Sequence, residues 1–193
     1  MASEGPLYDS AGSNNTGVGT EAWASTTNIG ADDGSNATIT LASAEQSNYL
    51  QADNLGFNVA DSVDGITVEI QRRVTSGLAD CRDHVVKLSK DGSAAIGTNK
   101  ADTATAYTTT ATTITYGGAA DLWGTTWLAS EINATTFAVL FSCKDADTGA
   151  SVQVDFIRVT VNYTAIPPED PAAAKRGRMV KTWRMTPEPE LVW

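Results

Sequence analysis

Proline is absent from the sequence between Leu7 and Ile166, whereas five of the six prolines lie within residues 167–193. Proline has no backbone N–H and is largely excluded from the interior of strands and helices. The proline-free stretch is therefore compatible with uninterrupted regular structure. The sharp change near residue 165 indicates that the C-terminal segment differs in kind from the body of the protein.

Histidine and cysteine are also scarce, with His84 as the only histidine and Cys81 and Cys143 as the only cysteines. A zinc site needs about four ligands at restricted spacing. A Ser-His-Asp triad would have to use His84, and no G-x-S-x-G turn or phosphate-binding glycine loop is present. We therefore expect no enzymatic activity, no metal and no cofactor, and we expect the two cysteines to be buried free thiols.

Basic side chains are few in the body of the chain. Residues 1–164 carry a net charge of −11, and residues 165–193 carry +1. An acidic surface repels nucleic acids and anionic membranes. No run reaches the roughly 18 apolar residues of a membrane-spanning helix, and the first residues do not resemble a secretory signal. We expect no nucleic-acid or membrane partner, and synthesis in a cytoplasm.

The body is rich in Thr, Ser, Asn, Asp and Gly, a composition typical of strands and turns. In residues 65–74, "GITVEIQRRV", alternate apolar side chains share one face, as expected of a half-buried strand, although Arg72 intrudes on that face. Further strands are predicted at residues 84–90, 135–144 and 151–163, and weaker ones at residues 36–41, 47–54, 94–99 and 111–116.

Two local features refine this pattern. The apolar face changes between Phe156 and Ile157, which predicts a β-bulge or bend. The only predicted helix is a short turn at residues 128–133, with Ser130 as its N-cap. The spacing of strands and turns predicts an all-β fold, an antiparallel, jelly-roll-like β-sandwich. We divide the chain into a flexible N-terminal arm (residues 1–19), a sandwich domain (20–164) and an extended C-terminal docking arm (165–193).

Two surface loops offer alternatives that the sequence leaves open. "DADTG" places Asp145 and Asp147 as in the start of a calcium loop, but Phe156 stands where an EF-hand has glutamate, so we expect an acidic turn. "DLWGTTW" places Trp123 and Trp127 around a glycine-containing turn. If one of these rings is exposed, it could stack on a sugar.

The sequence also resembles a known structural family. The ordered series "EAWASTTN", "ADDGSNATITL", "SNYLQADNLGF", "DGITVEIQRR", "YGGAADLWGTTWLASEINATTFAVLF" and "VQVDFIRVTVNY" resembles a β-sandwich domain of structural proteins in tailed bacteriophages and prophage-like regions. The match covers about residues 20–164. It implies a jelly-roll-like module of the virion, used in capsid decoration or in tail and neck components, and it brings no catalytic residues.

The C-terminal arm lies outside this resemblance. It holds basic and apolar side chains suited to docking on another protein; the predicted partner-binding residues are Lys175, Arg176, Arg178, Met179, Lys181, Trp183, Arg184, Met185 and Trp193. The segment "MVKTWRM" could also add as a strand to a sheet edge. The expected function is a capsid decoration or cement protein in a homo-oligomer, with a trimer favoured. Its expected partners are other virion proteins, capsid or tail subunits. The alternatives are a tail, neck or fibre component, or a carbohydrate-binding adhesion module.

Overall fold

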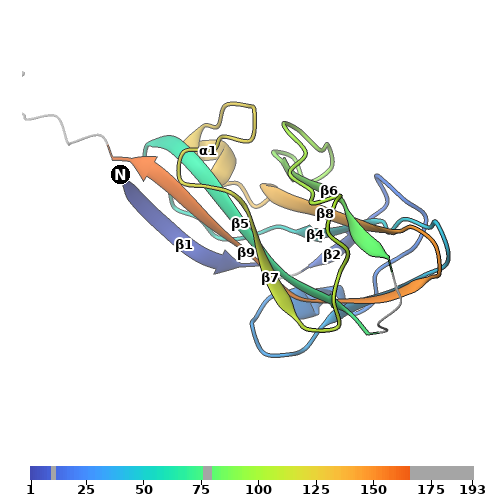
Figure 1. The fold of residues 1–193 in the computed structure, drawn as a ribbon. Coiled ribbons are helices and arrows are strands. Elements are labelled where there is room, and N and C mark those ends of the chain that lie inside the picture. The colour runs from blue at the N-terminus through green and yellow to red at the C-terminus, as the bar shows by residue number, and fades with distance from the viewer. Residues whose placement is uncertain (10–11, 76–79, 166–193) are drawn as a thin grey trace, which may run out of the picture.

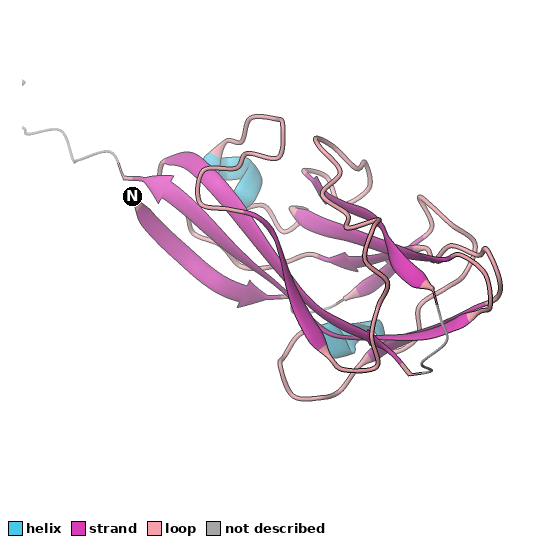
Figure 2. Cartoon of the chain, in the orientation of Figure 1, coloured by secondary structure: helices cyan, strands magenta, loops and turns pink. Residues whose placement is uncertain are grey.

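The computed structural model describes residues 1–9, 12–75 and 80–165, which form two antiparallel sheets packed face to face as a β-sandwich. Figure 1 shows the two layers and Figure 2 shows that strands dominate over helices. The strands are β1 (Ala2–Tyr8), β2 (Ser13–Asn15), β3 (Ala37–Leu41), β4 (Tyr49–Ala52), β5 (Ser62–Val74), β6 (Cys81–Ser89), β7 (Thr112–Gly117), β8 (Ala138–Asp145) and β9 (Ala150–Thr164). The helices are a 3-10 turn, η1 (Thr26–Ile29), and α1 (Ala129–Ile132).

The larger sheet has the order β1-β9-β5-β7, and β3 pairs with the remaining length of β9 beside β1. The smaller sheet has the order β2-β4-β8-β6. Every pairing between named strands is antiparallel, as predicted. This confirms an all-β sandwich.

The alternation in β5 is confirmed in detail. Ile66, Val68, Ile70 and Val74 are buried between the sheets, and Arg72 points the same way and is also buried. In β8 both faces are buried from Ala138 to Cys143. The core between the sheets is therefore built from the residues that period-two patterning selects.

The predicted break in β9 is confirmed as a β-bulge. The register with β5 passes from Gln71 opposite Phe156 to Arg72 opposite Val154, so Asp155 is the extra residue. The side chains of β9 exchange faces across this point. One carboxylate oxygen of Asp155 accepts a hydrogen bond from the Gly34 N–H at 3.0 Å, and burial raises the pKa of this carboxyl.

Three local expectations are wrong. Residues 1–19 are not a separate flexible arm, because β1 pairs with β9 and β2 pairs with β4. Residues 94–99 do not form a strand; Ile96 makes only an isolated bridge to Leu88. The N-cap of α1 is Leu128 and not Ser130, and Glu131 accepts the Leu128 N–H with its side chain. The pairing of β1 and β2 and the bridge at Ile96 are made by backbone groups, so side-chain patterning did not reveal them.

The two ends of the sandwich domain lie together. Ala2 of β1 is opposite Tyr163 of β9, and Thr164 is opposite Ser62 of β5. Figure 1 shows the start of β1 beside the end of β9 at one end of the molecule. Within the described ranges, no helix is long and apolar enough to cross a membrane.

Candidate functional site

The nine predicted partner-binding residues, from Lys175 to Trp193, lie outside the residues that the structure describes. What the structure shows is the strand from which the arm departs. β9 is the longest of the described strands, and it pairs with β1, β3 and β5. The chain therefore enters the arm from the strand with the most partners in the larger sheet.

An ion pair reinforces this strand near its middle. The Arg158 guanidinium of β9 binds the Glu69 carboxylate of β5, with Nε 2.9 Å from Oε2, and donates a further hydrogen bond to the Tyr8 hydroxyl of β1 at 3.1 Å. It also lies 4.8 Å from the centre of the Phe156 ring. One side chain thus joins three neighbouring strands on the outer face of the sheet.

The tryptophan loop does not present a sugar-stacking surface. Trp123 is fully buried and Trp127 is 7% exposed, so neither ring meets the condition of exposure on which the sugar-stacking alternative depended. The Trp123 indole N–H donates to the Ile66 carbonyl at 2.8 Å, and the Trp127 indole N–H donates to the Leu122 carbonyl at 3.1 Å. Trp127 packs edge-on against Phe137. Both rings serve the core.

A buried polar cluster joins the two sheets. Arg72 of β5 forms an ion pair with Asp83 of β6, and the hydroxyls of Tyr107 and Tyr116 donate to the same carboxylate at 2.7 and 2.6 Å. Burial, with a smaller contribution from the Asp83 charge, raises the pKa of both tyrosines, so they remain neutral donors. The cluster therefore links β5 of the larger sheet to β6 of the smaller one.

Of the ion pair in this cluster, the sequence identifies Arg72 but not Asp83. Arg72 on an apolar face implies a buried acidic partner, since a buried arginine is rarely left unpaired. Alternation in β6 does not single out Asp83, because the register shifts between Asp83 and Val85. Which carboxylate pairs with Arg72 becomes clear only from the sheet packing.

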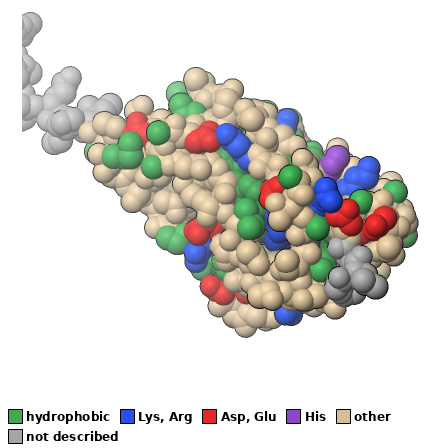
Figure 3. Space-filling model, viewed as in Figure 1, with side chains coloured by type: hydrophobic (Ala, Val, Ile, Leu, Met, Phe, Trp, Pro, Cys, Tyr) green, Lys and Arg blue, Asp and Glu red, His purple; other side chains and the backbone are tan. Residues whose placement is uncertain are grey.

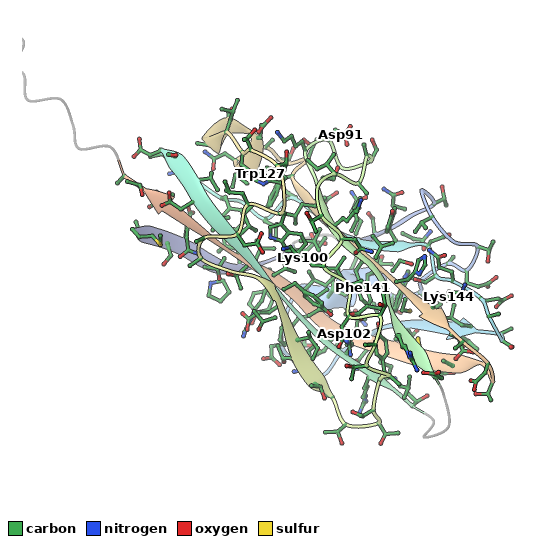
Figure 4. The ribbon with its side chains drawn as sticks, turned by 45° about the horizontal axis from the view of Figure 1, so that its top comes forward. Asp91, Lys100, Asp102, Trp127, Phe141 and Lys144 are labelled. Atoms are coloured by element: carbon green, nitrogen blue, oxygen red, sulfur yellow. The ribbon has the colours of Figure 1, made fainter. Side chains whose placement is uncertain are left out.

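A polar hollow of about 330 Å³ opens at the end of the smaller sheet. It is lined by Ala44, Asp80, Arg82, Asp83, His84, Thr103, Lys144, Asp145 and Ala146. Figure 3 shows the histidine at the surface beside basic side chains, and Figure 4 shows Lys144 and Trp127 toward opposite ends of the sandwich. Burial, and secondarily the Lys144 charge, lowers the pKa of His84.

The acidic turn next to this hollow is held by its own backbone. Oδ2 of Asp145 accepts the N–H groups of Asp147 and Gly149 at 3.2 and 2.8 Å. This is the turn-forming role that the sequence predicts for Asp145. Among the described residues no group of three or more histidine, cysteine or acidic side chains is arranged to hold a metal.

Cys81 and Cys143 are buried free thiols on neighbouring strands β6 and β8, as expected. Their mutual hydrogen bond, together with burial, raises the pKa of Cys81. A thiol with a raised pKa is a poor nucleophile, so Cys81 acts as a small core residue. Cys143 is also fully buried in the core.

No family model and no curated protein matches the chain. Solved structures with a similar arrangement include BiXyn10A CBM1 in its apo form, at a TM-score of 0.39 and 10% identity, covering 83% of this chain and 92% of that one. Another is the structure of the CBM22-1 and GH10 modules of the Clostridium thermocellum endo-1,4-β-D-xylanase 10B with xylohexaose. Its TM-score is 0.39 and its sequence identity to this chain is 10%. That match covers 86% of this chain but only 28% of the xylanase. The likeness is one of sandwich architecture, which the strand pairing establishes independently.

Proposed function

We propose that this protein is a structural subunit of a bacteriophage virion, a capsid decoration or cement protein that docks through its C-terminal arm. The observation that carries the proposal is the placement of β9. This strand pairs with three others and passes directly into the arm at Thr164. A force on the arm would therefore be spread over the larger sheet, as a cementing role requires.

Charge and composition support the same function. The arm is net basic, whereas residues 1–164 have a net charge of −11. Opposite charges steer association, and Trp and Arg are the residue types that most often dominate binding energy. An arm that orders on binding can cover a large area without a large domain interface, and its ordering cost is offset by many contacts in a repeated lattice.

The proposed partners are other virion proteins, and the protein forms a homo-oligomer, with a trimer favoured at threefold positions of a capsid. A tail, neck or fibre location is the variant of this proposal in which the arm anchors the sandwich domain to a different assembly. The resemblance in residues 20–164 supports both locations equally.

The test is incorporation into particles. Full-length protein and a version ending at Thr164 would be supplied during phage assembly, and purified particles would be assayed for each. The proposal expects incorporation of the full-length protein only. Circular dichroism on the shortened protein would confirm that the sandwich is folded. Normal incorporation of the folded, shortened protein would overturn the docking role of the arm.

Single substitutions sharpen this test. Trp183→Ala is expected to weaken docking by about 2 kcal/mol or more if the ring is a buried anchor. Thr182→Ala, beside it in sequence, is the matched control and should be incorporated normally. Equal incorporation of both variants, with unchanged particle heat stability, would remove Trp183 from the docking surface.

A carbohydrate-binding adhesion module is the second candidate, and the polar hollow at the end of the smaller sheet is the observation that favours it. Arg82, His84 and Lys144 line this open depression, and cationic side chains are common hydrogen-bond donors to sugar hydroxyls. Binding on a glycan array that is lost in Lys144→Ala would support this function. Absence of binding by the wild-type protein would dispose of it.

A further inference from the structure

The larger sheet has three edge strands among the described residues, β1, β3 and β7. The outer side of β3 is partly covered, because Ala24 exchanges two backbone hydrogen bonds with Thr38. An unpaired edge presents N–H and C=O groups to which another strand can add, and proteins usually block such edges with charge, proline or a bulge. β1 is blocked in all three ways. It contains Glu4 and Pro6, and its register shifts between Glu4 and Leu7.

β7 has none of these protections. Its six residues, TTITYG, contain no charge and no proline, and its pairing with β5 runs without a register shift. The side chains are mostly exposed; Tyr116 is buried and Ile114 is partly buried against the core. Within the described part of the chain, no segment pairs with the outer side of this strand.

The opposite sheet shows what a covered edge looks like in this molecule. The outer side of β6 is occupied by the following loop, whose N–H groups at Ile96, Lys100 and Tyr107 donate to carbonyls of β6 at 2.9, 2.9 and 2.8 Å. The loop ends shortly before β7 begins. β7 therefore stands out as a regular edge left open.

The phase of the hydrogen bonds identifies the free backbone groups. In an antiparallel pair, hydrogen-bonded and non-bonded residue pairs alternate. The Gly118 N–H donates to the Ile66 carbonyl at 3.1 Å, immediately beyond the Thr67–Gly117 pair. It follows that Ile114 and Tyr116 bond to β5, whereas Thr113 and Thr115 direct their N–H and C=O groups toward the open side.

We propose that residues 179–185 of a second copy of this chain add as an edge strand to β7. This inference rests on the proposed function, since it names the receptor for the docking arm between neighbouring copies. The segment, MVKTWRM, has no proline or glycine and is rich in residues favoured in strands. Its seven residues are enough to cover the six residues of β7.

Reach and charge are consistent with a neighbouring copy as the donor. Residues 165–178 separate the end of β9 from this segment and could extend over about 46 Å. A strand as long as β9, with 15 residues, is about 50 Å long. The linker is thus nearly as long as the sandwich and can reach the β7 edge of an adjacent copy that lies within this distance. The acidic surface of that copy suits the basic residues Lys181 and Arg184.

The first test is hydrogen exchange on the full-length protein across a range of concentrations. We expect the amides of Thr113 and Thr115 to become protected as the concentration rises, in parallel with oligomer formation measured by native mass spectrometry. A full-length variant with residues 179–185 replaced by a Gly-Ser sequence should lose this protection. Rapid exchange at every concentration would overturn the proposal. Protection that is independent of concentration in a monomer would also overturn it, because the donor would then be the chain itself.

Matched substitutions at one position complete the test. Thr115→Pro removes an outward N–H but leaves the hydrogen bonds of Ile114 and Tyr116 to β5, and we expect it to weaken self-association at least about tenfold. Thr115→Val keeps the N–H and should associate as the wild type does. Equal association of the two folded variants would refute the edge pairing.

The two proposals can fail separately. If arm deletion abolishes particle incorporation while the β7 amides stay unprotected, the virion function stands and the receptor is elsewhere. If the β7 amides are protected by the arm while arm deletion leaves incorporation intact, the strand pairing stands and the docking function of the arm is wrong.

Discussion

Arg72 and Asp83 form an ion pair enclosed between the two sheets, with Arg72 Nε 2.8 Å from Asp83 Oδ1 and Nη2 donating to Oδ2 at 3.3 Å. Arg72 belongs to β5 and Asp83 to β6, so the pair links the two layers of the sandwich. The guanidinium also stacks on the Tyr107 ring, 3.9 Å from its centre. The carboxylate accepts hydrogen bonds from both neighbouring tyrosines, so its removal would leave several buried groups unsatisfied.

We expect Asp83→Leu to lower the free energy of unfolding by about 3–5 kcal/mol, because it leaves the Arg72 charge buried without a partner. Urea denaturation followed by tryptophan fluorescence measures this directly. The double variant Arg72→Met with Asp83→Leu should recover part of the loss, since it removes both charges.

The control for this prediction is a surface pair. Arg82 and Asp80 are 2.7 Å apart, but their side chains are 39% and 31% exposed. Arg82→Gln should therefore change the unfolding free energy by at most about 1 kcal/mol. A loss from Asp83→Leu no larger than that of the control would mean that the enclosed pair is not a structural tie.

The pKa of His84 tests how this side chain is packed in the hollow. Burial and then Lys144 lower the pKa of His84, so its NMR titration midpoint should lie below the usual value of about 6.5. Lys144→Gln should move the midpoint upward. A midpoint at or above the usual value in the wild type would contradict the described packing.

The sign of the linked stability change follows from the same shift. The folded state binds this proton more weakly than the unfolded state, so the stabilisation is present above about pH 6.5 and is lost as the pH falls through the lowered pKa. His84→Gln should therefore lose less stability than the wild type between pH 7.5 and pH 5. The prediction is tested by measuring the unfolding free energies of the wild type and of His84→Gln at these two pH values.

Side-chain periodicity predicted the strands whose inward residues are apolar, and it located the bulge in β9 through the change of face near Phe156. It could not predict β1, because the strand ASEGPLY has no clear alternation and is held by backbone pairing with β9. The same limit explains the mistaken strand at residues 94–99. There, hydrogen bonds from irregular backbone cover the edge of β6.

The candidate sites show a similar division. The sequence marked Trp123 and Trp127 by residue type, but type does not tell a stacking platform from a core ring, and the loop conformation turns both inward. Arg72 was identifiable as an anomaly in its strand, whereas its partner depended on how two sheets far apart in sequence pack together. The open edge of β7 could not be inferred without the strand order.

Two adjacent glycines differ both in backbone geometry and in local crowding. Gly117 has a φ of +73°, and a Cβ there would meet the Ile66 carbonyl and the Trp123 ring; a Cβ on Gly118 would meet nothing. Gly117→Ala should destabilise the protein by at least about 1–2 kcal/mol from the left-handed conformation alone. Thermal unfolding of Gly117→Ala and Gly118→Ala compares the stabilities of the two variants. An equal loss of stability in both would show that the turn adapts to a side chain at Gly117.

Gly118→Ala is the matched control. Its φ is not positive and its surroundings are open, so alanine should be neutral or slightly stabilising, by up to about 1 kcal/mol through a smaller unfolded-state entropy. A large loss in this control would mean that β7 and the following turn are less open than described.

Substitution of the two loop tryptophans distinguishes core packing from ligand binding. Trp123 is enclosed and hydrogen-bonded to Ile66, so Trp123→Ala should cost about 3–5 kcal/mol of unfolding free energy through the cavity it leaves. Trp127→Ala should cost less, because one side of that ring is covered by the flexible Lys90 side chain, 5.2 Å from the ring centre. Urea denaturation gives both values. If instead Trp123→Ala keeps wild-type stability but abolishes retention on a glycan column, the ring is a binding surface, and the adhesion function becomes the better explanation of this loop.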